Sequence, residues 1–345
     1  MEKLGKIFVD KQKSNDEKQK DLKDSLFAKG LEAAGFNEEE QNTLREIEKA
    51  TQEAIQDVKE IWKRFVRKEY VEETVEITRH KFGSSVDSSL IASQAATILE
   101  DPERSKIMKR YETELREIIK PKSIKLIFLP DLSGSMGEDE RRAVQEACYA
   151  VSKSLYLFRD EMAVNSEKGK SPLQVETAMI GFGSTTSILP HEKEIKEENT
   201  RLNRSILDIG SVNLGGTRNA KALEKARDMF TANDLEKIKA TELLAIVIEI
   251  TDGETETEVE SIKLVDELNT KGIFTKGIKI PGFNMINEKT NKPYTPEELE
   301  QVESLRGTFE RVYRQHGKTL SALKQLKSVL LKLLAKAESK EVKKP

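Results

Sequence analysis

The sequence predicts an α/β protein with a doubly wound, mostly parallel sheet, preceded by an all-α helical domain. Apolar runs of strand length recur at residues 124–130, 175–182, 243–250 and 273–280, and segments of helical periodicity separate them. Continuous apolar runs are typical of strands that are buried on both faces of a sheet. Strands alternating with helices favour parallel pairing, with helices covering both faces. The first third of the chain shows helical periodicity and lacks such runs.

The amino-terminal region begins with residues 1–20, which are nearly all polar, so we expect a disordered segment or a frayed helix there. Asn37 and Glu40 form a capping-box pair that predicts a helix start. Apolar residues then recur in steps of three and four over 44–65. Such a stripe either joins or dimerises with a partner, or packs inside the protein's own small bundle.

Three further segments complete the predicted helical domain, which we place at residues 21–119. Residues 69–83 are charged and read as helical, and a helix at 101–119 starts at Asp101-Pro102. Between them, Asp87 or Ser88 is positioned to cap a short helix over 88–99.

The second predicted domain covers residues 120–338, and a charged tail follows at 339–345. Within it we expect helices at 138–160, after Thr217, at 259–268 and at 320–334, the last being the final helix. Two further strands are expected, an antiparallel edge strand at 186–189 and a last strand at 309–313. The other segments are a polar turn at 165–172, a loop or weak helix at 191–200 and an insertion at 283–308. The insertion is a candidate for partner selectivity or a decoration of the fold.

Oxygen-bearing side chains follow the carboxyl ends of two predicted strands. Asp131, Ser133 and Ser135 come directly after the first strand, and Asp252 follows the strand at 243–250. Thr217 lies on a glycine-bent loop before a helix. Mg²⁺ takes about six oxygen ligands, so the first loop alone supplies too few donors. In a parallel sheet the three segments meet at one edge, where ligands bind.

These five residues, in this order, resemble the metal-ion-dependent adhesion site (MIDAS) of the von Willebrand factor type A (VWA) family, and the resemblance covers residues 120–338. It implies a Rossmann-like fold in which Ser133, Ser135 and Thr217 bind Mg²⁺ directly, with Mn²⁺ or Ca²⁺ as alternatives. It implies that Asp131 and Asp252 act directly or through water. The remaining coordination position then accepts a Glu or Asp of a partner protein.

Composition excludes several other classes of function. The formal net charge is −3 with 34 % charged residues of both signs, so neither nucleic acid nor an anionic membrane is an expected partner. The single cysteine, Cys148, excludes an intramolecular disulfide and a cysteine-based zinc site. No apolar run is long enough to span a bilayer, and the amino terminus lacks a signal-peptide pattern, so we expect a cytoplasmic protein.

We expect no enzymatic activity. A haloacid-type phosphatase needs a second aspartate where this chain has Ser133, and no Ser-His-Asp order is evident, with His80, His191 and His316 scattered. Gly169-Lys170-Ser171 lacks the earlier glycine and the preceding strand of a phosphate-binding loop.

The leading hypothesis is therefore a cytoplasmic adaptor that binds Mg²⁺ and captures an acidic residue of a partner. The helical segment before the VWA-like region resembles bacterial intracellular VWA proteins, which implies a MoxR-type AAA+ ATPase as partner. Two alternatives stay open: a VWA subunit of a chelatase that inserts Mg²⁺ or Co²⁺, and a structural interaction protein with an incidental metal. The oligomeric state is not assigned. Glu249, inside a buried strand, is expected to pair with a Lys or Arg or to lie at the rim.

Overall fold

A computed structural model describes residues 27–80, 85–100, 106, 108–164, 173–191, 195–252, 255–280, 286–287, 292–293, 327 and 329–332. The chain divides into two compact units. One consists of Val66–Lys120, and the other combines Met1–Phe65 with Pro121–Pro345.

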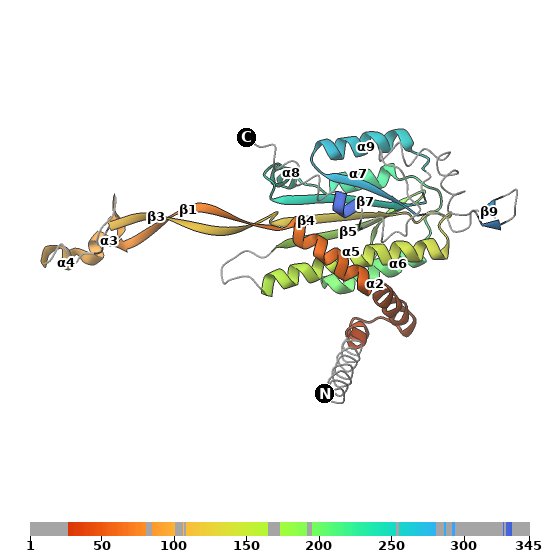
Figure 1. Cartoon of the computed structure of the whole chain (residues 1–345), viewed down its shortest axis with the longest axis horizontal. Helices are drawn as coiled ribbons and strands as arrows, with labels where there is room; N and C mark the ends of the chain where they lie inside the picture. Colours follow the sequence, from red (N-terminus) through yellow and green to blue (C-terminus); the bar gives the residue numbers. More distant parts are fainter. Residues whose placement is uncertain are drawn as a thin grey trace, which may run out of the picture. The chain divides into compact units, whose positions relative to one another are not determined.

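A five-stranded sheet forms the centre of the larger unit, with the strands in the order β6-β5-β4-β7-β8 (Figure 1). Its strands are β4 Ser123–Pro130, β5 Gln174–Phe182, β6 Thr186–Leu189, β7 Leu243–Thr251 and β8 Phe274–Lys279. All neighbours pair in parallel except β6, which is antiparallel to β5. The four predicted parallel strands and the antiparallel edge strand are thus confirmed.

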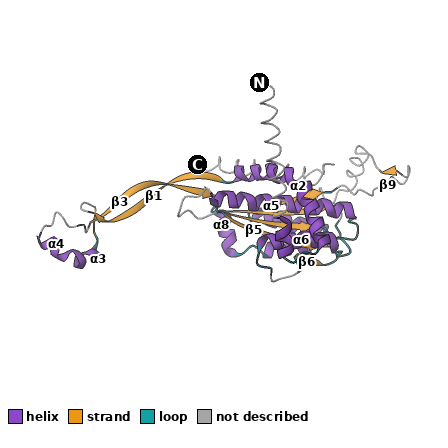
Figure 2. Ribbon diagram, turned by 90° about the horizontal axis from the view of Figure 1, so that it is seen from below, coloured by secondary structure: helices purple, strands orange, loops and turns teal. Residues whose placement is uncertain are grey.

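Helices cover both faces of this sheet, as the sequence predicts (Figures 1 and 2). They are α5 Glu138–Val164, α6 Glu198–Ser211, α7 Ala220–Asp228, α8 Ala232–Lys239 and α9 Glu258–Thr270. The expected loop or weak helix at 191–200 leads into α6, and α6 and α8 were not predicted as full helices. Their start signals are local: the Glu197 carboxylate caps the first turn of α6, and Thr231 with Asp234 makes a capping box for α8.

The core lies on either side of the central strands. Every residue of β7 is buried, and Ile127, Leu129 and Val247 pack with apolar residues of α7 and α9. Because side chains alternate along a strand, Leu126 and Phe128 point to the opposite face, where they are also fully buried. With both faces apolar, polar side chains gather at the strand ends.

The amphipathic helix α2 Glu38–Phe65 begins at the predicted capping box. The Asn37 N–H donates to Glu40 Oε2 at 2.8 Å, and the Glu40 N–H donates to Asn37 Oδ1 at 2.9 Å. The apolar stripe, with Trp62 fully buried, faces α5 of the same chain, and the Trp62 indole N–H donates to Ser154 Oγ at 3.0 Å. The stripe therefore packs internally.

The smaller unit corrects two predicted helices. Residues in the predicted helix 69–83 form β1 Arg67–His80, and residues in the predicted helix 101–119 form β3 Met108–Lys120. The two strands pair antiparallel from Arg67↔Lys120 onward, and β2 Ser85–Val86 pairs with β3. Their Glu, Lys and Arg residues favour helix locally, whereas their β-branched and aromatic residues suit a strand once a partner is available.

The short helix predicted at 88–99 is present as α3 Ser88–Ile91, a 3₁₀ turn Ala92–Gln94 and α4 Ala95–Glu100. Asp87 provides the cap, since its Oδ1 accepts the Ser89 N–H at 3.1 Å.

Several predictions lie outside the described residues: the segment 1–20, the turn at 165–172, the strand at 309–313 and the tail at 339–345. The insertion at 283–308 is described only at β9 Ile286–Asn287 and β10 Lys292–Pro293, and the final helix at 320–334 only at 327 and 329–332, which are helical. In the described part of the chain, no helix has both the length and the apolar character needed to cross a bilayer.

Candidate metal centre

Asp131 sits at the carboxyl end of β4 and is fully buried. Its N–H donates to the Ile250 carbonyl at 2.9 Å, which fixes the backbone beside β7. Its carboxylate accepts the Ser133 N–H at Oδ1 (2.9 Å) and the Thr251 hydroxyl at Oδ2 (2.7 Å). Asp131 therefore holds the turn that carries the two serines and links it to the end of β7.

The two serines and Asp252 form a continuous series of hydrogen bonds. Ser133 Oγ and Ser135 Oγ are 2.9 Å apart, and the Ser135 hydroxyl donates to Asp252 Oδ2 at 2.7 Å. Ser133 is buried and Ser135 is exposed, so the series leads from the protein interior to the surface. Donors from β4 and β7 thus converge at one edge of the sheet.

Thr217 joins this group through a pocket of about 390 Å³, here called the rim pocket. Its lining residues are Ser133, Gly134, Ser135, Gly215, Gly216, Thr217, Thr255 and Glu256. Two backbone bonds hold the loops together: Gly134 N–H to Gly215 O at 2.7 Å and Leu214 N–H to Leu132 O at 2.8 Å. Gly215 adopts φ +79°, a conformation that favours glycine and turns the chain into the pocket.

Arg141, near the start of α5, connects the loop after β4 to the loop after α6 through hydrogen bonds. Its guanidinium donates to the Met136 carbonyl at 3.1 Å, the Val212 carbonyl at 2.6 Å and the Ser133 carbonyl at 3.4 Å. The planar guanidinium presents several donors in fixed directions, so it can bind carbonyls of two loops at once.

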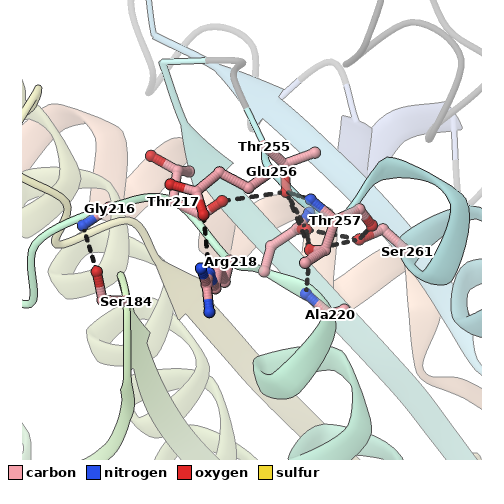
Figure 3. Close-up of polar contacts among 10 residues, drawn as sticks. Ser184, Gly216, Thr217, Arg218, Ala220, Thr255, Glu256, Thr257 and Ser261 are labelled. Carbon is pink, nitrogen blue, oxygen red and sulfur yellow. Dashed lines mark hydrogen bonds and ion pairs between the residues drawn. The ribbon is translucent and has the colours of Figure 1, made fainter.

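Asn219, also buried, links the Thr217 loop to the loop after Asp252. Its amide Nδ2 donates to both oxygens of the buried Glu249 carboxylate, at 3.0 and 3.1 Å. Its Oδ1 accepts three hydroxyls, at 2.6, 3.1 and 2.6 Å, from Thr255, Thr257 and Ser261. Figure 3 shows these hydroxyls gathered beside Ala220 at the start of α7. Glu249 is therefore inside the protein and bound by an amide.

The electrostatics of the site fit a hard divalent cation. Burial, with the nearby negative charge of Asp252, raises the pKa of Asp131 to about 6, although the hydrogen bonds from Ser133 and Thr251 act to lower it. A cation placed among these oxygens would relieve both effects. The donors are carboxylates and hydroxyls, the oxygen chemistry that Mg²⁺, Mn²⁺ and Ca²⁺ prefer. The described residues hold no cluster of three or more His, Cys, Asp or Glu side chains, so a cation here depends on the hydroxyls.

The structure thus brings all five predicted residues to one sheet edge. Sequence reasoning did not identify Arg141, Asn219 or Glu256 as part of this edge. Arg141 and Asn219 act through loop geometry, for which the sequence carries no motif, and Glu256 was one acidic residue among many.

A second polar series lies on the edge strand. The Ser187 Oγ and His191 Nε2 are 3.0 Å apart, and His191 Nδ1 lies 3.2 Å from Asp208 Oδ2. The same carboxylate oxygen accepts the His191 N–H at 2.9 Å. The sequence did not suggest this Ser-His-Asp arrangement. The His191 side chain is 48 % exposed, and the bonds join β6 to α6.

Comparison with known proteins identifies a family model, the von Willebrand factor type A domain, which matches residues 125–328. An uncharacterized protein of Treponema pallidum (strain Nichols) is 26 % identical over 171 residues, which cover 47 % of this chain and 28 % of the relative. The chain therefore spans less than a third of that relative's length.

Two solved structures align weakly with the chain. Manganese-loaded Plasmodium vivax TRAP protein aligns with a TM-score of 0.34 and 12 % identity, covering 76 % of this chain and 78 % of that one. Proximal thread matrix protein 1 of the mussel byssus, with a zinc-occupied MIDAS motif, aligns with a TM-score of 0.35 and 14 % identity, covering 62 % and 46 %.

Proposed function

The chain belongs to the von Willebrand factor type A family, whose domain model matches more than half of it, and we propose that it is a protein-binding adaptor that depends on a divalent cation. The observation that carries the proposal is the convergence of Ser133, Ser135 and Thr217 on the rim pocket, with Asp252 bonded to Ser135. Asp131 stabilises the turn by accepting the Ser133 N–H.

Ser133, Ser135 and Thr217 would hold the cation. Asp252 would orient the Ser135 hydroxyl, Asp131 would hold the turn through the Ser133 N–H, and both carboxylates would supply charge. A bound Mg²⁺ contributes a Lewis-acidic position that accepts an incoming carboxylate. Apart from Glu256, the pocket is lined by hydroxyl side chains and glycines, so a partner's Glu or Asp side chain meets no other large side chain as it approaches.

The finer parts of this proposal derive from the sequence resemblance. They are a MoxR-type AAA+ ATPase as partner, a cytoplasmic location, Mg²⁺ as the physiological ion and the absence of enzymatic activity. A chelatase subunit and an interaction protein with an incidental metal remain alternative hypotheses. Affinity capture with and without Mg²⁺ tests the role of the metal: loss of an AAA+ ATPase with the metal supports the adaptor or the chelatase subunit, which share this class of partner, and partner binding retained in excess chelator supports the incidental metal.

The cation site is tested directly by a Mg²⁺ titration that follows thermal unfolding. Wild type should gain stability as Mg²⁺ rises, because a ligand that binds the folded state alone stabilises it. Thr217→Val removes one donor hydroxyl at nearly constant volume and should abolish most of the gain. Ser211→Ala is the matched control, since its hydroxyl only donates to the Leu207 carbonyl in α6. Equal gains in wild type and Thr217→Val would contradict the proposal.

A further inference from the structure

Glu256 carries the carboxylate among the eight residues that line the rim pocket. Glu256 lies in the loop between Asp252 and α9, and its side chain is about half exposed. The five predicted donors do not include it. Its position nevertheless adds an exposed negative charge to the lining of the pocket.

Two contacts anchor Glu256 beside the predicted donor Thr217. The Glu256 N–H donates to the Thr217 carbonyl at 2.8 Å, so the backbone of the two residues is joined. The carboxylate lies over Gly216, because a Cβ added there would sit 2.6 Å from Glu256 Oε1. A glycine at this position lets the carboxylate approach the pocket. Figure 3 shows Glu256 close to Thr217 and Arg218.

Arg218 holds the other carboxylate oxygen, with its Nε 2.8 Å from Glu256 Oε2. The side chains of the two residues are 51 % and 52 % exposed. Ion pairs this exposed contribute little to the stability of the fold, because water screens both charges. A divalent cation bound in the same pocket would therefore compete with Arg218 for this carboxylate.

We propose that Glu256 is an internal acidic ligand of the cation site; this proposal rests on the proposed function. With a cation held by Ser133, Ser135 and Thr217, the Glu256 carboxylate leaves Arg218 and takes the coordination position that a partner's acidic side chain would use. A partner must displace it, and Arg218 then receives it back. Because Glu256 is tethered to the site, its effective concentration there is high, and only a well-placed partner acid displaces it.

The test uses Mn²⁺ alone as the probe and water-proton relaxation as the readout, which reports the number of water molecules on the bound ion. Glu256→Ala should carry one more exchanging water than wild type and bind Mn²⁺ about tenfold more weakly. Alanine is chosen because the amide oxygen of glutamine could still coordinate. Glu260→Ala, which removes an exposed carboxylate of α9 outside the rim pocket, is the matched control and should behave as wild type.

The water count decides the question, because removing any nearby negative charge weakens cation binding through space. If the number of bound waters is unchanged in Glu256→Ala, Glu256 is not a ligand and its proposed role is overturned. The cation site itself would still stand, provided that Ser135→Ala abolishes Mn²⁺ binding. Wild type that binds no Mn²⁺ would overturn both. Arg218→Gln should move the opposite way and bind Mn²⁺ a few-fold more tightly, since it releases the carboxylate; weaker binding would contradict the proposal.

Discussion

The Ser135 hydroxyl donates to Asp252 Oδ2 at 2.7 Å, although 117 positions separate the two residues in the sequence. The bond joins the turn after β4 to the end of β7, two neighbouring strands of one parallel sheet. Ser135 is exposed and lines the rim pocket, so this residue can be changed without disturbing the core.

Ser135→Ala should lower the affinity for Mg²⁺ at least tenfold, because the cation loses one of three hydroxyl donors. Its effect on the free energy of unfolding in chelator should stay within about 0.5 kcal/mol, as is usual for exposed positions. Calorimetric titration with Mg²⁺ and urea unfolding in EDTA measure the two quantities. Wild-type affinity in the variant would exclude Ser135 as a ligand.

Asp131 should make the metal-free protein pH-sensitive. Its pKa is raised from 3.8 to about 6 in the folded state, so the folded protein binds a proton there that the unfolded chain has already lost. The stabilisation from this proton is complete below about pH 4 and disappears as the pH rises through about 6. Two pKa units correspond to about 3 kcal/mol.

Urea unfolding in EDTA between pH 4 and 7.5 tests this dependence. Other carboxylates also titrate in this range, so the informative quantity is the difference between wild type and Asp131→Asn. Wild type should lose stability relative to the variant as the pH rises. Parallel curves for the two proteins would show that Asp131 keeps an ordinary pKa.

Asn219→Ala should destabilise the protein, because it leaves the buried Glu249 carboxylate without the amide that donates to both of its oxygens. The expected cost is about 3 kcal/mol in the free energy of unfolding. The variant should also weaken Mg²⁺ binding, since two hydroxyls of the loop after Asp252, with that of Ser261 in α9, lose their common acceptor.

A double-mutant cycle with Glu249→Leu provides the control for Asn219. If the two residues stabilise the fold through each other, their effects should fail to add, with the double variant less destabilised than the sum. Additive effects would mean that Asn219 acts through its hydroxyl partners alone.

Trp62 is the single tryptophan of the chain, so its fluorescence reports the docking of α2 on α5. It is fully buried, and its indole N–H donates to Ser154 Oγ. Ser154→Ala should leave that N–H without its acceptor and cost about 1 kcal/mol. Urea unfolding followed by tryptophan emission measures this cost, and an unchanged midpoint would place the indole outside the α2–α5 contact.

Ser187 should not react as a nucleophile despite its bond to His191. The imidazole is about half exposed, so water competes for Nε2, whereas catalytic bases gain most in sites that exclude water. Treatment with a fluorophosphonate and mass spectrometry should leave Ser187 unmodified. Labelling that Ser187→Ala and His191→Ala both abolish would instead establish a hydrolytic site on the β6 edge.

Local sequence patterns were enough to predict the parallel strands and the five candidate donors. Long apolar runs can be satisfied only by burial on both faces, and the carboxyl ends of parallel strands meet at one edge, so Asp131 and Asp252 had to converge. The capping box at Asn37 and Glu40 was equally predictable from the sequence, because its hydrogen bonds connect residues three positions apart.

Features that depend on a partner far away in the sequence could be seen only in the folded structure. Residues 67–80 and 108–120 carry helix-favouring charges, and their pairing with each other makes them strands. Asn219 contacts Glu249 across 30 positions of the sequence, and Arg218 contacts Glu256 across 38 positions. Local sequence pattern carries no signal for such contacts, because their free energy arises only once the sheet has brought the segments together.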